Sequence, residues 1–197
     1  MLNVMGLEMR MIKPWEYLIF LPAVFFFAFV VNRDLIHPFY MSVFFFAWGI
    51  TSFSTLNTKH EATRKLVLSL PITKREYIGA KYLLAIVWFL ISTVVTTFFL
   101  LPLAFFIGLS IDFFSLELWI AMFLLYLMLN SVYIPLALFI RSIGWIVPLA
   151  LAAFITAGPD VFSMPKIAFY PTLLVAPLLF SLSYYGSVKI MEGKDVT

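Results

Sequence analysis

The 197-residue sequence contains no cysteine and few charged residues. Without cysteine the chain can form no disulfide, no thiolate nucleophile and no cysteine metal site. Charged residues make up 12% of the sequence, against roughly 25% in soluble domains. The net charge of +3 is too small to indicate a nucleic-acid partner. These absences exclude thiol chemistry and argue against both nucleic-acid binding and a soluble domain.

Groups for catalysis, ATP hydrolysis and ion coupling are missing as well. The eight glycines form no Gly-x-x-x-x-Gly-Lys-Ser/Thr phosphate-binding loop, so we expect no ATPase site and no cofactor on this chain. His37 and His60 are expected on opposite sides of a membrane, where they cannot share a metal or serve one nucleophile. Glu16 and Lys81 are expected at the inner boundary with their charges in water, which disfavours an ion-coupled carrier. An ion-coupled carrier remains an alternative only if Glu16 lies inside the membrane and not at its inner boundary.

Hydrophobic residues, by contrast, make up 63% of the sequence and include 23 phenylalanines. A helix of about 20 mainly apolar residues crosses a bilayer. The sequence therefore predicts an all-α integral membrane protein, one domain over residues 1–197, with six transmembrane helices. Their predicted ranges are 15–31, 39–56, 82–109, 116–140, 143–157 and 167–188. The fifth is short, and Gly158, Pro159 and Pro165 separate it from the sixth.

Lysine and arginine are distributed unequally between the two sides of this arrangement. With the N-terminus inside, the outer links hold only Arg33 and Lys166 among the basic residues. Basic residues of short loops stay in the cytoplasm, so we expect both ends of the chain there. Aromatic residues near the predicted borders are interpreted as anchors in the membrane interface. Among them are Tyr40, Tyr82, Trp119 and Tyr185.

The longest stretch between two spans is residues 57–81. Its sequence TKHEATRKLVLSL places apolar residues on one face of a helix, and Pro71 ends that helix. Thr73 and Glu76 form a capping box, which starts a second helix at Lys74 that continues into the third span. Two ordered helices that meet at a proline favour a surface for a cytoplasmic partner. The alternative for this segment is a connecting loop that binds acidic lipid. A non-transporting scaffold or assembly factor would use the same surface to dock a cytoplasmic protein.

The run LSLPITKREYIGAKYL, preceded by HEATRKL, resembles the inner loop of permease subunits of type-two ATP-binding-cassette (ABC) exporters. Among these are bacterial exporters for peptide toxins, bacteriocin immunity and antibiotic resistance. The layout is also similar, with a short interfacial helix at residues 1–14, six spans and both ends inside. The short link between spans five and six departs from many relatives, which have a larger outer segment.

The resemblance implies a division of labour between subunits. Residues 57–70 would be a coupling helix seated on a separate ABC ATPase subunit, which would bind ATP and magnesium, and residues 71–81 would link it to span three. Two permease subunits would pair, as a homodimer or a heterodimer, in a bacterial cytoplasmic membrane. The residues implied in the contact with the ATPase are Lys59, His60, Glu61, Arg64, Lys65, Leu66, Leu70, Pro71, Lys74, Arg75 and Glu76.

Polar residues inside the spans are the candidates for lining a pathway. They are Ser92, Thr93, Thr96, Thr97 and Asn130. The first four form two pairs at a spacing of four residues on one helical face. The alternative is that these groups bond to their own helix or join neighbouring helices. The phenylalanine-rich spans suit an amphipathic or hydrophobic substrate, such as a peptide, toxin or drug, better than a sugar or an ion.

Overall fold

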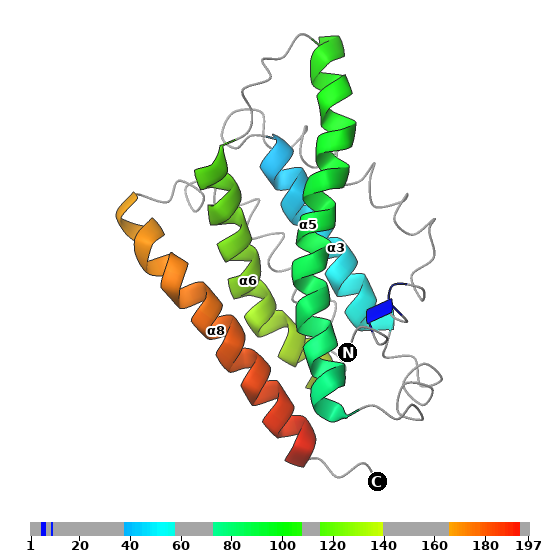
Figure 1. Cartoon of the computed structure of the whole chain (residues 1–197), viewed down its shortest axis with the longest axis vertical. Helices are drawn as coiled ribbons and strands as arrows, with labels where there is room; N and C mark the ends of the chain where they lie inside the picture. Colours follow the sequence, from blue (N-terminus) through cyan, green and yellow to red (C-terminus); the bar gives the residue numbers. More distant parts are fainter. Residues whose placement is uncertain are drawn as a thin grey trace.

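The computed structural model describes residues 5, 6, 9, 38–57, 73–107, 115–139 and 166–193. These ranges contain four long helices and no strand (Figure 1). The helices are α3 (Pro38–Asn57), α5 (Lys74–Ile107), α6 (Leu116–Phe139) and α8 (Lys166–Gly193). The prediction of an all-α protein is confirmed for this part of the chain.

Three of these helices contain segments that are long and apolar enough to cross a membrane. The segments are Lys74–Phe99, Leu116–Phe139 and Pro171–Gly193, and α3 contributes a shorter apolar segment, Ser42–Ser52. The four helices correspond to predicted spans two, three, four and six. Predicted spans one and five lie outside the described residues, so the count of six stays a prediction. Of the predicted interfacial helix, only Met5, Gly6 and Met9 are described.

The helices pack as two close pairs. α3 packs most extensively against α5, and α6 packs most extensively against α8. Between α3 and α5 lies a cluster of buried side chains that includes Phe46, Ile50, Ala80 and Leu84. A larger cluster draws residues from all four helices and joins the pairs, chiefly through aromatic rings. The core therefore consists of two apolar clusters, one within the α3–α5 pair and one that joins the two pairs.

Three helices run in one direction and α5 runs in the other (Figure 1). The ends at Asn57, Lys74, Phe139 and Gly193 therefore lie at the same end of the bundle, the lower end in Figure 1. We call it the basic end, because it also holds the described basic side chains. They are Lys74, Arg75, Lys81 and Lys189.

The prediction of interfacial anchors is wrong for two of the aromatic residues. Tyr40 is buried, and its hydroxyl donates to the Ser115 carbonyl at 3.1 Å. Tyr82 is also buried and contacts serine hydroxyls of α8. Both tyrosines face neighbouring helices, because an aromatic ring with a hydroxyl can satisfy a polar group inside a bundle as well as at a headgroup. Tyr185, in contrast, is 61% exposed.

Candidate functional site

The start of α5 is a complete capping box. The Glu76 amide donates to Thr73 Oγ1 at 3.2 Å, and the Thr73 amide donates to Glu76 Oε2 at 3.0 Å. The Thr73 hydroxyl also donates to Glu76 Oε2 at 3.0 Å. These bonds satisfy amide donors that the first turn of a helix leaves open. The predicted cap is confirmed, and it holds the first turn of α5 at the point where the chain enters from residues 58–72.

Lys81 lies two turns further along and fastens α5 to α3. Its side chain is 3% exposed, and Nζ donates to the Ser54 carbonyl in the last turn of α3 at 3.3 Å. Nζ also lies 5.9 Å from the centroid of the Tyr77 ring, within range of a cation–π contact. A cation at the C-terminal end of a helix is favoured by the helix dipole. The expectation that Lys81 keeps its charge in water is therefore wrong.

Residues 78–82 of α5 are all buried, which means that the helix is enclosed on every side at this level. The sequence there is Ile-Gly-Ala-Lys-Tyr, and Ile78 and Ala80 have no exposed surface. Small residues let neighbouring helices approach closely. Near its basic end, α5 is thus enclosed by its neighbours and bonded to α3 through Lys81.

A second set of polar contacts crosses the middle of the bundle. The Tyr126 hydroxyl of α6 donates to the Ala85 carbonyl of α5 at 3.0 Å. It lies 2.6 Å from Thr51 Oγ1 of α3. Thr51 Oγ1 also donates to the Ala47 carbonyl of its own helix at 2.8 Å, and either hydroxyl of the Thr51–Tyr126 pair could be the donor to the other. One tyrosine therefore joins three helices.

The predicted pathway residues are divided between two helices, and most of their described bonds stay within their own helix. Thr93 donates to the Phe89 carbonyl at 3.0 Å, and Thr97 donates to the Thr93 carbonyl at 2.7 Å. The Thr93 hydroxyl also accepts from Nε1 of Trp119 on α6 at 3.1 Å.

The remaining members of that set are buried. Asn130 donates from Nδ2 to the Tyr126 carbonyl at 2.8 Å, and its Oδ1 has no hydrogen-bond partner among the described residues. Ser92 and Thr96 are buried in α5, and within the part of the chain that the structure describes the Ser92 hydroxyl has no hydrogen-bond partner either. No hydrogen bond between described residues links Asn130 of α6 to the other four on α5, and a pathway role for the five stays a prediction.

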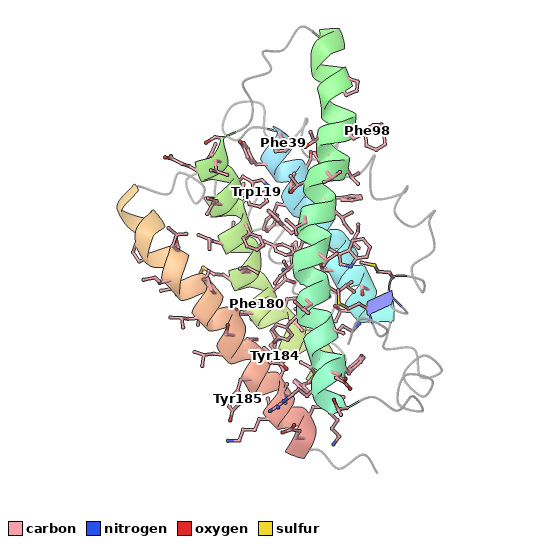
Figure 2. The ribbon with its side chains drawn as sticks, viewed as in Figure 1. Phe39, Phe98, Trp119, Phe180, Tyr184 and Tyr185 are labelled. Atoms are coloured by element: carbon pink, nitrogen blue, oxygen red, sulfur yellow. The ribbon has the colours of Figure 1, made fainter. Side chains whose placement is uncertain are left out.

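Aromatic rings fill the space between the two helical pairs. The Phe89 ring of α5 contacts the rings of Trp119, Phe123 and Tyr126 on α6, with centroid separations of 5.5, 5.0 and 5.2 Å. Trp119 and Phe123 stack with an interplanar angle of 13°. Figure 2 shows Trp119 on α6 and, by contrast, Phe98 on the outer side of α5. These rings therefore lie at the contact between α5 and α6, which belong to different pairs.

Residues 7–192 match a family of membrane proteins described as ABC-2 family transporter protein. The chain belongs to this family. No curated protein and no solved structure matches it. This protein is therefore an ABC-2 permease, the membrane component of an ABC transporter and not its ATPase. Membership implies a multi-pass membrane protein with an ABC ATPase as its partner.

The predicted ATPase contacts of this ABC-2 permease fall mainly outside the described residues. Those outside are Lys59, His60, Glu61, Arg64, Lys65, Leu66, Leu70 and Pro71. The structure does place Lys74, Arg75 and Glu76 in the first turn of α5, where Arg75 is exposed and Glu76 completes the cap. The described residues contain no group of three His, Cys, Asp or Glu side chains that could hold a metal.

The residues that sequence reasoning missed are the ones that join helices of the permease. Lys81, Tyr82 and Tyr126 each bond to a helix other than their own. The available signal was a lysine or tyrosine within or beside an apolar segment, since a buried polar group needs a partner. That signal predicts that a partner exists but does not say which helix supplies it.

Proposed function

We propose that this permease is the membrane subunit of an ATP-driven exporter and that residues 57–70 receive the movement of its ATPase. Two permease copies would form the pathway with two ATPase subunits, which bind ATP and magnesium. The substrate would be an amphipathic or hydrophobic molecule, such as a peptide, toxin or drug. ATP hydrolysis would then occur only on the partner subunits.

The observation that carries this proposal is the contact between α5 and α3 at the basic end. Residues 58–72 connect Asn57 of α3 to Thr73, and both helices meet there through Lys81 and Ser54. The capping box keeps the first turn of α5 intact. A push on the connecting segment is therefore applied to a rigid pair of helices and not to a frayed end.

The charge distribution supports a cytoplasmic location for the basic end. Lys74, Arg75 and Lys189 lie at this end, and so does the described C-terminal end of α8 at Gly193. Basic residues remain on the cytoplasmic side of a bacterial membrane. The opposite direction of α5 relative to α3, α6 and α8 agrees with the predicted topology. We therefore propose that both termini are cytoplasmic and that the membrane is the bacterial cytoplasmic membrane.

The polar groups of the described interior support an apolar or amphipathic substrate. Apart from Lys81 they are hydroxyls, amides and indoles, and many of the hydroxyls bond to backbone carbonyls. A pathway for an ion would need charged or carbonyl ligands. A substrate that is itself mainly apolar needs few polar partners from the protein.

The test uses proteoliposomes that contain the permease and the ABC ATPase that co-purifies with it. We expect Glu61→Ala, Arg64→Ala and Leu66→Ala to lower permease-stimulated ATP hydrolysis and transport at least tenfold, without loss of folded protein. Lys189→Ala is the matched control, because Lys189 is an exposed residue at the same end of the bundle. Wild-type coupling in all three variants contradicts the proposal. Tight binding to the ATPase without transport indicates a scaffold instead.

A further inference from the structure

Pro135 leaves one backbone carbonyl inside α6 without its usual amide donor. Proline has no amide hydrogen, so it cannot donate to the carbonyl four residues earlier, which is that of Ser131. The hydroxyl of Ser183 on α8 donates to this carbonyl. A side chain from the neighbouring helix therefore supplies the hydrogen bond that α6 cannot make for itself.

The same serine continues to α5. Tyr82 OH lies 2.6 Å from Ser183 Oγ and 3.1 Å from Ser187 Oγ. Since the one hydrogen of Ser183 is used on Ser131, Tyr82 donates to Ser183, and its oxygen is left to accept from Ser187. Tyr82, Ser183 and the Ser131 carbonyl thus form a chain of hydrogen bonds across α5, α8 and α6. We call this chain the hydroxyl relay.

The relay lies in an enclosed, aromatic setting. Tyr82 and Ser187 are buried, and the Tyr82 ring contacts Phe180 and Tyr184 of α8 with centroids 5.0 and 5.6 Å apart. Figure 2 shows Phe180 near the middle of α8 and Tyr184 closer to the basic end. Hydrogen bonds in such a setting are stronger than in water, and successive hydroxyls polarise one another. The relay fixes both the distance and the rotation of α5 against the other pair.

The hydroxyl relay meets α5 directly beside the contact between α5 and α3. Tyr82 follows Lys81, so two consecutive residues fasten α5 to α3 on one side and to α8 on the other. We propose that Tyr82 and Ser183 are positioning residues and that the hydroxyl relay passes movement of α5 to the α6–α8 pair. The inference rests on the proposed function in one respect: that function supplies the movement of α5.

The first measurement concerns geometry and needs no ATPase. The chain has no cysteine, so spin labels attach only at cysteines introduced by Arg75→Cys and Glu192→Cys, which are exposed positions near the basic ends of α5 and α8. We expect one narrow distance distribution in the wild-type background. Tyr82→Phe and Ser183→Ala should broaden it, and Ser183→Thr should restore it because the hydroxyl is kept. Tyr185→Phe is the matched control, since that tyrosine lies two residues after Ser183 on α8 and is exposed.

The second measurement is transport per ATP hydrolysed in the complex with the ABC ATPase. We expect Tyr82→Phe and Ser183→Ala to lower this ratio at least fivefold, with co-purification of the ATPase unchanged. Pro135→Ala distinguishes an effect of the relay on helix geometry from an effect on the stability of the fold. Its new amide supplies the Ser131 carbonyl with a donor inside α6 that competes with Ser183, so we expect higher thermal stability together with broader distances and a lower ratio.

Two results overturn the inference. One is a wild-type distance distribution in both Tyr82→Phe and Ser183→Ala. The other is a Pro135→Ala protein that is more stable and keeps wild-type distances and transport. A wild-type permease that binds no ATPase refutes the proposed function alone, because the distance distributions still decide whether the relay positions α8.

Discussion

The two halves of α5 lie in different surroundings. Near the basic end, residues 78–82 are all buried, and Lys81 and Tyr82 form hydrogen bonds to two other helices. In the far half, Val94 is 68% exposed and Phe98 is 74% exposed. Figure 1 shows the far end of α5 extending beyond the other three helices. The helix α5 is therefore bonded to other helices at one end. At its other end the described residues leave much of its surface exposed.

The difference shows where side-chain identity matters in this permease. In a bilayer the apolar side chains gain little by leaving lipid, so close packing and hydrogen bonds hold helices together. The basic half supplies both, with Gly79 and Ala80 for close packing and Lys81 and Tyr82 for bonds. The far half offers large apolar side chains that suit lipid equally well. Substitutions should accordingly have large effects at one end and small effects at the other.

The largest effect is expected from Ala80→Leu. Ala80 has no exposed surface and packs in the cluster with Phe46 and Ile50 of α3. Three additional carbon atoms force the helices apart, so we expect a loss of about 3 kcal/mol in the free energy of unfolding, at the upper end for overpacked cores. The measurement is denaturant-induced unfolding in detergent. Val94→Leu, which enlarges an exposed side chain, is the control; equal losses would remove the distinction between the two halves.

A smaller but clear effect is expected from Tyr126→Phe, at the level between the two halves. The variant keeps the ring but leaves the Ala85 carbonyl and the Thr51 hydroxyl without this partner. We expect a loss of about 1–2 kcal/mol in the free energy of unfolding, since a buried group is left unsatisfied. Tyr185→Phe, with the same chemical change at an exposed site, should have no measurable effect. Similar unfolding curves for the two variants would show that the three-helix contact contributes nothing.

The same contrast explains how much could be predicted from the sequence. The helices and their ends follow from local signals. Apolar length predicted the second, third, fourth and sixth spans, and Thr73 with Glu76 predicted the start of α5. Each of these signals is contained within one helix and needs no knowledge of its neighbours.

The bonds between helices could not be predicted in this way. The spans are apolar on all sides, so no polar face indicates which side is turned toward the core. Lys81 and Tyr82 were accordingly placed at the membrane boundary, whereas each meets a partner that is distant in sequence. For Pro135 the sequence does indicate an open carbonyl at Ser131, but only the fold shows that Ser183 meets it.

A modest and local effect is expected from Thr73→Ala. The variant removes both bonds of the threonine hydroxyl in the capping box. Loss of such a cap costs about 1 kcal/mol. We expect faster hydrogen exchange of the amides at residues 74–77, with little change in the rest of α5. Thr73→Ser keeps the hydroxyl and should exchange like the wild type; fraying in that variant as well would mean that the hydroxyl is not what holds the first turn.

The smallest effect is expected from Phe98→Leu in the far half of α5. Phe98 is exposed and lies on the outer side of the helix (Figure 2), so leucine should serve as well against lipid. We expect a change within about 0.5 kcal/mol in the free energy of unfolding, as for most surface substitutions. Phe89→Leu is the matched comparison, because the same change at a fully buried ring removes contacts with Trp119, Phe123 and Tyr126. Losses of equal size at the two positions would mean that the far half of α5 packs against protein after all, and the contrast between its ends would not hold.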